Sequence, residues 1–550
     1  MAAIVTDQFR INNASNFLGD VNDTSNSYYV FVGLSNPGIS NAFGRAASDS
    51  TWNSSTPNPT DDFNYLNHSK DTMIFGKKIT PDNIRRVIRK VSWTSGNRYE
   101  IYRHDYNSSN TSPITDSSRL YDSNYFVLNK DYNVYICINN GSSGINTEGN
   151  RSQNEPLFTG LEPTRAAGSV DDGYIWKFLF SVAPSDIIKF DATEFIPLPN
   201  DWSSSTDAQI TAVRDNGNSD VNNNQLKNVY IADQGNGYAG GTGQEFNIIG
   251  DGSGGKVIVD VVGTKITGTQ MSVGGKGYTY GMVDLTSISS GAVSNSTPAK
   301  LIPIIPPSKG HGYDLYKELG ADRVLVYARF DDSTKDFPID TKFAQIGIVK
   351  NPTSIGSTQV FTDNQFSSVK SLYLNSFDVN QSISIGDKIE QKIYDGTTEV
   401  GKAFGYVVSY DIISEDDADK IAILKFYQDR SLYFNPTTGD QTDYTDANNI
   451  TERGNSSGTI YNFESNATAS TNQSIEQVGG SWNAKINYGF SGITTNPTGN
   501  KIVELGVEFT NGIAASEINN ESGDIIYLDN RALITRDARQ KEDIKVILEF

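Results

Sequence analysis

The sequence predicts a mostly β protein with a few helices, and three observations carry this prediction. Only 37% of the 550 residues are hydrophobic, yet Tyr and Phe are numerous, at 28 and 26. Asn, Ser, Thr, Asp and Gly are common among the remainder, and they favour turns and caps over helix interiors. These turn formers divide the aromatic and β-branched residues into short runs, which are typical of short strands. The length exceeds that of a single core, so we expect about two to four domains.

The N-terminal part contains a strand pattern followed by a helix pattern. The run "SYYVFVGLS" (27–35) is rich in aromatic and β-branched residues and predicts a strand. The segment "TPDNIRRVIRKVSW" (80–93) predicts the clearest helix, because Thr80 suits an N-cap and Pro81 suits the first helical position. Its apolar residues recur at helical spacing: Ile84, Val87, Ile88 and Val91.

The opposite face of this expected helix carries four positive charges: Arg85, Arg86, Arg89 and Lys90. A solvated face on a surface helix is the simpler interpretation, and a charged interface is the alternative. The whole chain has 45 Lys and Arg against 65 Asp and Glu, a formal net charge of −20. In so acidic a chain, four clustered positive charges suit an acidic partner, so these residues are the candidate assembly interface.

Strand patterns and aromatic residues return at 124–140, 171–184 and 194–199. Residues 201–225 are polar and poorly patterned, so they predict a domain boundary. Residues 300–355 return to the pattern of a core, with strands expected in "RVLVYARF" and "FAQIGIVKNP".

The later part of the chain is also β-patterned. In residues 356–500, turn signals recur about every 8–12 residues, as in a sandwich or a small barrel. The C-terminal segment 522–550 ends on a strand of alternating apolar residues.

A glycine-rich block at 216–299 contains an internal repeat. The motif "QGNGY" ends at Tyr238, and the motif "GGKGY" ends at Tyr278. Between them, "KVIVDVV" and "KITGTQMSV" predict two strands joined by a tight turn at Gly263 and Thr264. Two Gly-x-Gly-Tyr units with an intervening hairpin predict a small β module.

The stretch "GDGSGGK" (250–256) in this block imitates the glycine-rich loop that binds nucleotide phosphates. The residue after Lys256 is Val257, so the hydroxyl that would ligate Mg²⁺ is missing. The segment that follows has a strand pattern, whereas a phosphate would need the N-terminus of a helix. We therefore interpret these glycines as turn residues and expect no nucleotide cofactor.

Other catalytic arrangements find little support in the sequence. The single cysteine, Cys137, lies in the strand-like "NVYICINN", where burial is the simplest role. The three histidines, His68, His104 and His311, lie in polar or glycine-rich contexts; His311, between Gly310 and Gly312 with Asp314 nearby, is the most interesting, and a turn residue is its simpler interpretation. Neither zinc spacing nor a calcium loop is present, so we expect no metal and no catalytic residue. A pair of glycosidase carboxylates remains open, because carboxylates are abundant.

The sequence also predicts which partners are absent. An acidic surface disfavours nucleic acid and anionic membranes. No apolar run approaches the roughly 18 residues of a membrane span, and the polar N-terminus does not look like a signal peptide. We therefore expect synthesis in the cytoplasm without membrane insertion.

Several of the core-like segments resemble one known family. The matching segments occur in the same order as in that family: "AIVTDQFR" followed by Asn16 and Phe17, "YVFVGLSNP" (29–37), "PNPTDD" (57–62), "SWTSGNRY" (92–99), "DDGYIWKFLF" (171–180), "KFAQIGIVKNP" (342–352) and 522–550. Together they resemble the baseplate wedge subunit of contractile-tailed bacteriophages of the T-even type. The most specific match is the Asp-Gly-Tyr-x-Trp motif, which comprises Asp172, Gly173, Tyr174 and Trp176.

This resemblance implies a layered β-sandwich core with inserted small β domains. The implied ranges are a wedge core at 1–215, 300–355 and 501–550, with insertions at 216–299 and 356–500. The glycine block also resembles, more weakly, Gly-Tyr repeat modules of other phage structural proteins. Within the family motif, alternating Tyr174, Trp176, Phe178 and Phe180 are expected to be core residues on one strand face, with Gly173 in the turn.

The resemblance also implies a structural role in the virion. Wedge subunits of this family form homodimers, contact other wedge and hub-proximal tail proteins, and take part in the rearrangement that triggers sheath contraction. No enzymatic activity is implied. Two alternatives remain open: a tail-fibre or carbohydrate-binding host-recognition protein, and a tail-associated polysaccharide depolymerase that uses two carboxylates. We expect the insertions to decorate the surface.

Overall fold

The structure is a computed structural model in which strands predominate, and this confirms the predicted mostly β class. It describes residues 5–34, 49–217, 224–239, 241–288, 297–331, 342–385, 387–416, 419–427, 462–465, 474–493, 508–535 and 540–550. The chain forms two units. Unit 1 comprises Met1–Leu18, Ile84–Val326 and Lys545–Phe550, and unit 2 comprises Gly19–Asn83 and Tyr327–Ile544. The predicted ranges 216–299 and 356–500 lie partly outside the described residues, and their boundaries stay predictions.

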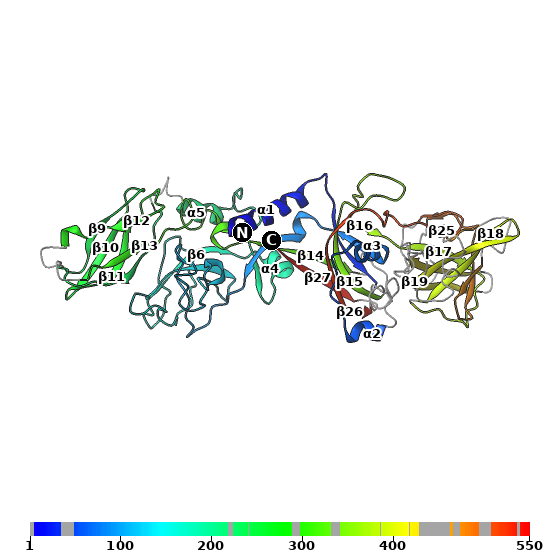
Figure 1. The fold of residues 1–550 in the computed structure, drawn as a ribbon, viewed down its shortest axis with the longest axis horizontal. Helices are drawn as coiled ribbons and strands as arrows, with labels where there is room; N and C mark the ends of the chain where they lie inside the picture. The colour runs from blue at the N-terminus through cyan, green and yellow to red at the C-terminus, as the bar shows by residue number, and fades with distance from the viewer. Residues whose placement is uncertain are drawn as a thin grey trace, which may run out of the picture. The chain divides into compact units, whose positions relative to one another are not determined.

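A five-stranded antiparallel sheet forms one core of unit 2 (Figure 1). Its strands, in spatial order, are β16 (Gln365–Ser367), β2 (Met73–Lys78), β1 (Tyr28–Gly33), β15 (Lys342–Lys350) and β26 (Asp524–Thr535). All six residues of β1 are buried, because this apolar strand lies centrally between β2 and β15. The predicted strand at 27–35 is thus confirmed. Two helices accompany the sheet in this unit: α2 (Asp49–Ser54) and α3 (Phe63–Asp71).

A closed barrel forms a second core of unit 2. Its strands pair in the order β20 (Asp419–Tyr427), β19 (Thr398–Asp416), β18 (Lys388–Asp395), β21 (Ser474–Gln477), β22 (Asn483–Ile486) and β17 (Lys370–Asn375), and β17 pairs back to β20. The short strand β25 (Ile513–Ala514) also pairs with β17, and β23 (Gly492–Ile493) pairs with β24 (Glu508–Phe509). Alternate residues of the barrel strands fill the interior, among them Leu372, Ile389, Val407, Leu424, Ile475 and Ile486.

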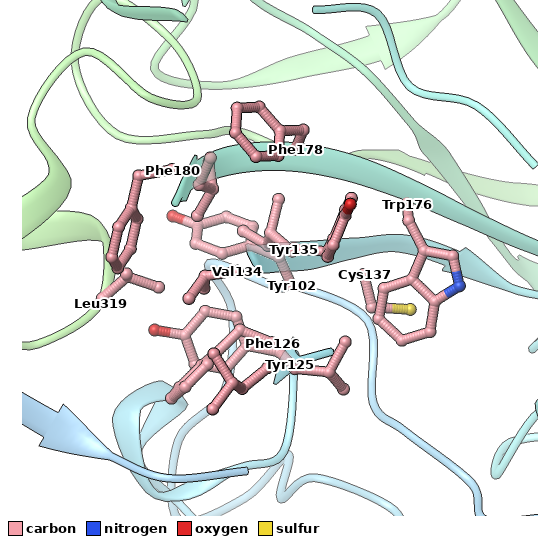
Figure 2. Packing of buried hydrophobic residues seen from close by; sticks show 14 of the residues in the cluster. Tyr102, Tyr125, Phe126, Val134, Tyr135, Cys137, Trp176, Phe178, Phe180 and Leu319 are labelled. Atoms are coloured by element: carbon pink, nitrogen blue, oxygen red, sulfur yellow. The ribbon is translucent and has the colours of Figure 1, made fainter. Parts of the chain in front are cut away.

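The core of unit 1 is built on two sheets. One has the order β4 (Phe126–Leu128), β5 (Asn133–Asn140) and β6 (Tyr174–Ser181), and the other has the order β27 (Lys541–Glu549), β14 (Arg323–Asp331), β3 (Ile84–Arg89) and β7 (Phe195–Pro197). Figure 2 shows the aromatic centre of this core, where Phe126, Tyr135 and Trp176 lie among other fully buried side chains. The helices are α1 (Asp7–Asn22), which continues past Leu18, and α4 (Pro184–Phe190), α5 (Ala208–Gly217) and α7 (Leu315–Glu318). Short 3-10 turns lie at Pro81–Asn83, Leu120–Asp122 and Thr286–Ile288.

The polar segment predicted as a boundary, 201–225, contains helix α5. Val213 on this helix is fully buried in the core of unit 1. Residues 218–223 lie outside the described part of the chain.

The glycine-rich block and the segment that directly follows it fold into two small sheets with a hydrophobic cluster of their own (Figure 1). The first has the order β11 (Lys265–Val273), β10 (Lys256–Val262), β9 (Gln244–Gly250) and β12 (Gly281–Val283), and the second pairs β8 (Val229–Asp233) with β13 (Lys300–Pro303). The predicted hairpin is confirmed, since Val262 pairs with Lys265 across Gly263 and Thr264. Gly263 has φ +67°, a conformation that favours glycine in this turn.

The two Gly-x-Gly-Tyr units share one geometry. Gly235 and Gly275 each precede their tyrosine by three residues, and both have φ +62°. A Cβ atom on either glycine would approach Cε2 of Tyr238 or Tyr278 to 2.7 Å. Each glycine therefore makes room for the ring of its own unit, and both tyrosines are buried.

The predicted helix at 80–93 is wrong, because this segment forms strand β3 after a single 3-10 turn. Strand β3 pairs with β14 along one edge and with β7 along the other. Ile84, Val87 and Ile88 are all buried, so the apolar spacing that resembled a helix is satisfied by a strand buried between two partners. Both partners are distant in sequence, and β-branched residues suit the strand better than a helix.

One buried polar side chain connects the barrel wall to a neighbouring segment. Gln391 on β18 is fully buried; its Nε2 donates to the carbonyl of Glu464 at 2.6 Å, and its Oε1 accepts the N–H of Glu464 at 2.8 Å. The adjacent Phe463 ring lies 4.7 Å from that of Phe426. The side-chain amide of Gln391 thus forms with Glu464 the pair of hydrogen bonds that the backbone of an adjacent strand would form, and this fixes residues 462–465 against the barrel.

We predict that Gln391→Leu destabilises the barrel by about 1–3 kcal/mol, because the two hydrogen bonds between the Gln391 amide and the backbone of Glu464 are lost. Urea unfolding followed by circular dichroism measures this loss. The exposed Lys485 on β22 provides the control, and Lys485→Gln is expected to leave the unfolding midpoint within error. Equal midpoints for wild type and Gln391→Leu would contradict the assignment.

Candidate functional site

The four residues predicted as an assembly interface lie on or next to β3 and have contacts within the chain. Arg85 Nε lies 3.2 Å from Asp186 Oδ2, and Lys90 Nζ lies 2.8 Å from Asp191 Oδ1. In both ion pairs, the side chains are largely buried. These two positive charges are therefore balanced by carboxylates of unit 1.

The other two arginines are directed at aromatic and carbonyl groups. The guanidinium of Arg86 lies 3.9 Å from the ring centroid of Tyr316, and Arg86 is buried. Arg89 donates to the carbonyls of Tyr121 and Ser123, and thereby fastens the 3-10 turn at Leu120–Asp122 to β3. All four residues thus have internal roles, and their part in an assembly interface stays a prediction.

The family motif forms a turn that leads into β6. Asp172 is buried, and its carboxylate accepts three backbone N–H groups, from Gln153 (2.8 Å), Asn154 (3.2 Å) and Tyr174 (3.0 Å). Gly173 has φ +79°, and a Cβ there would lie 2.8 Å from an amide nitrogen of Asn150. The aspartate and the glycine therefore fix how the loop at 150–154 meets the strand.

The aromatic residues of the motif are buried, as the core interpretation expects. Tyr174 stacks on Trp176 with ring centroids 5.2 Å apart. The Tyr174 hydroxyl accepts the N–H of Tyr99 and donates to the carbonyl of Asn150, both within 2.9 Å. Figure 2 shows Trp176 beside Cys137 at one side of the core. Burial raises the pKa of the Cys137 thiol well above its usual value, so this cysteine is protonated at neutral pH.

The glycine-rich stretch at 250–256 leads directly into strand β10, so no helix N-terminus follows it. Its Lys256 ammonium pairs with Glu245 at 2.8 Å. A Cβ on Gly252 would approach Cγ of Tyr278 to 2.4 Å, and the N–H of Gly255 donates to the Tyr278 hydroxyl at 3.0 Å. These glycines therefore accommodate the Tyr278 ring.

His311 forms a buried pair with a carboxylate that the sequence did not suggest. Its Nδ1 lies 2.6 Å from Glu318 Oε1, and Oε2 of Glu318 accepts the N–H of Gly312 at 2.6 Å. Asp314, the neighbour expected from the sequence, instead caps α7. The Tyr102 ring packs edge-on against the imidazole, so the pair lies inside the core. The side chain of His68 lies outside the described residues.

A cleft of about 620 Å³ in unit 1 is lined by one end of β5, by β8 and by the edge strand β11. Most of its lining side chains are polar, among them Ser142, Ser143, Arg165, Asn224, Asp260, Thr267, Thr269 and Gln270. Glu162 and Lys227 line one end. In the described part of the chain, no group of three or more His, Cys, Asp or Glu side chains is placed to hold a metal ion.

Two lysines are buried next to this end of the cleft. Lys177 is fully buried on β6; its Nζ donates to the carbonyl of Leu161 at 2.7 Å and to Asn216 Oδ1 at 2.9 Å. The Lys227 side chain is only 4% exposed, and its Nζ lies 3.0 Å from Glu162 Oε2. Burial, together with the positive charge of Lys227, lowers the pKa of Lys177 to about 8.

Glu162 is the anion shared by this network. Its Oε1 accepts hydrogen bonds from the side-chain amides of Asn216 at 2.7 Å and Asn224 at 3.0 Å. Partial desolvation would raise the pKa of Glu162, but the hydrogen bond from Asn216 and the charge and hydrogen bond of Lys227 outweigh it and lower the pKa. The sequence analysis missed this network. The only local signal was Lys177, the one charged residue inside the aromatic run "YIWKFLF".

We predict that Asp172→Asn lowers the free energy of unfolding by about 1–3 kcal/mol, because an amide cannot accept all three backbone N–H groups. Differential scanning calorimetry of the purified chain measures the change. The neighbouring Asp171 gives a matched control, since its side chain is 71% exposed and Asp171→Asn should cost about 0.5 kcal/mol or less. A larger loss for Asp171→Asn than for Asp172→Asn would be inconsistent with this assignment.

We also predict a pH dependence that originates at Lys177. The unfolded chain keeps the ordinary pKa of 10.5, so between the two pKa values it binds more protons than the folded chain. Stability should therefore rise with pH in this window. Relative to Lys177→Met, the wild type should gain about 1–2 kcal/mol from about pH 8 to about pH 9.5.

Urea unfolding of both proteins at several pH values gives this difference. The variant Lys265→Met, which removes an exposed lysine on β11, should follow the wild-type pH dependence. A wild-type advantage that stays constant or shrinks with rising pH would refute a lowered Lys177 pKa.

Comparison with models of known protein families gives no match to this chain, and comparison with curated protein sequences gives none either. Among the described residues, no helix is both long and apolar enough to cross a membrane.

Proposed function

We propose that this chain is a structural protein of the virion, a wedge subunit of a contractile phage tail baseplate. In this proposal it acts as a homodimer, binds neighbouring wedge and hub-proximal tail proteins, and takes part in the rearrangement that triggers sheath contraction. Its work is done through protein–protein contacts, without catalysis or a cofactor.

The observation that carries this proposal is where the resembling segments lie in the fold. The segments 29–37, 342–352 and 522–550 contribute β1, β15 and β26, which are adjacent strands of one sheet. Segments that are far apart in sequence but resemble one family thus meet in a single core. This coherence supports the resemblance, because chance matches would be scattered over unrelated parts of the fold.

Unit 1 supports the proposal in the same way. The most specific segment, 171–180, supplies the Asp172 turn and most of strand β6, and its aromatic side chains lie in the main core. The segment 92–99 leads to Tyr99, whose N–H donates to the Tyr174 hydroxyl. Two resembling segments are therefore in direct contact here as well.

Most strands of the regions without resemblance form sheets of their own, although β16 of the later region pairs with β2 in the five-stranded sheet. The glycine-rich block, together with β13 just after it, forms the sheets of β8 to β13, and the later insertion supplies the barrel strands β18 to β22 and β17. Each has its own hydrophobic cluster. This arrangement fits modules added to a family core, and we propose that they decorate the baseplate or reinforce wedge contacts.

Light scattering of the purified chain tests the proposal. We expect a dimer with twice the chain mass of 60.1 kDa, because wedge subunits of this family are dimeric. A stable trimer would instead favour a tail fibre. Cleavage of a host polysaccharide that is abolished by one Asp or Glu substitution would contradict a purely structural role.

Cryo-electron microscopy of purified contractile tails that contain this chain provides the decisive measurement. We expect its density in the wedges around the central hub. Density confined to fibres, or no incorporation into tails, would overturn the proposal.

A further inference from the structure

The Lys227 ammonium at the end of the unit 1 cleft has unused hydrogen-bonding capacity. An ammonium has three N–H donors. In the described part of the chain, Lys227 Nζ has one hydrogen-bond partner, Glu162 Oε2 at 3.0 Å, although its side chain is only 4% exposed. A buried ammonium with open donors is costly unless another acceptor reaches it.

The charges around Lys227 are also unbalanced. The positive charge of Lys227 lowers the pKa of Lys177; the negative charge of Glu162 acts on both lysines, and that of Glu318 acts on Lys177 as well. Both carboxylate oxygens of Glu162 are engaged, one by Lys227 and the other by Asn216 and Asn224. An additional anion beside Lys227 would offset the excess positive charge.

Two other charged groups line the cleft, and both have partners. Arg165 forms an ion pair with Asp171 at its exposed side. Asp260 accepts the N–H of Gly243 at 2.7 Å through Oδ1. Arg165 carries no negative charge, and Asp260 forms no hydrogen bond or ion pair with Lys177 or Lys227 within the described residues, so neither group balances the two lysines. At the Glu162 end of the cleft, the N–H donors without a partner among the described residues are those of Lys227.

The remaining lining suits a ligand with many hydroxyl groups. Gln270, Ser142 and Ser143 line the cleft, and their side chains form no hydrogen bond within the described residues. Amides and hydroxyls can both donate and accept, as sugar hydroxyls require. The volume of about 620 Å³ lies within the range of small-ligand sites and can hold about two or three sugar rings.

We propose that this cleft binds an acidic saccharide, whose carboxylate pairs with Lys227 and whose hydroxyls contact the polar side chains of β11 and of the loop at 142–143. This goes beyond the proposed assembly role and does not depend on it. The ligand class follows from the site: an anion for the buried ammonium and a polyol for the uncharged polar lining.

Isothermal titration calorimetry tests the proposal with three probes: a galacturonate trisaccharide, a hyaluronan tetrasaccharide and an α2,8-linked sialic acid trimer. We expect at least one of them to bind, and its carboxyl methyl ester to bind at least about tenfold more weakly. Sodium acetate serves as a further arm, because it carries the charge without the hydroxyls and should bind far more weakly than the saccharide.

Three variants locate the binding site. Lys227→Met should weaken binding at least about tenfold, whereas Lys256→Met, which removes a lysine of the same module outside the cleft lining, should leave it unchanged. Thr267→Trp places a bulky side chain at an exposed lining position on a strand that tolerates aromatic residues, so it should block binding without disturbing the lysine network.

The proposal is overturned if none of the three saccharides binds, or if the methyl ester or acetate binds as tightly as the acid. It is also overturned if Thr267→Trp, folded by circular dichroism, binds like the wild type. This last comparison decides the matter even if Lys227→Met fails to fold.

Discussion

The antiparallel pairing of β1, β15 and β26 is the constraint on which unit 2 depends. At the end of β1, the N–H of Ser27 donates to Asn351 Oδ1 at 2.7 Å across 324 positions of sequence. β15 then pairs with β26, which lies on the far side of the barrel segments in sequence. The entropic cost of closing a loop grows only slowly, by about 0.6 kcal/mol for each doubling of its length. Once these three strands pair, long insertions between them add little further cost, which explains how one sheet accommodates so much intervening chain.

Patterns that are satisfied locally could be predicted from the sequence. The hairpin around Gly263 depends on neighbouring residues alone, and the strand at 27–35 could be predicted because its uninterrupted apolar run suits a buried strand, although its partner β15 is remote. The segment at 80–93 could not be predicted, because its partners β7 and β14 are remote in sequence. Its apolar spacing fits a helix face and a doubly paired strand equally well, and only the tertiary pairing selects the strand.

The candidate site shows the same division. The turn at Gly173 before an aromatic strand could be predicted from the motif, whereas the hydrogen bonds that Asp172 accepts from the backbone of Gln153 and Asn154 could not. The lysine network is assembled from four separate segments that carry Glu162, Lys177, Asn216 and Lys227. Nothing in the spacing of these residues predicts that they meet, and a lone lysine in an aromatic strand indicates only that some polar partner must exist.

The long separation between β1 and β15 has a consequence for synthesis on the ribosome. The apolar strand β1 emerges early, but β15 follows only after more than half of the chain, and β26 comes near the end. Until then β1 can pair with β2 but lacks β15 on its other edge, and such an unpaired hydrophobic edge is a hazard for aggregation. The hairpin of β10 and β11 needs only local contacts and can form at once. We expect ribosome-bound chains that stop before residue 342 to protect the glycine-rich module from protease while β1 is still cleaved, and early protection of β1 would disprove this order.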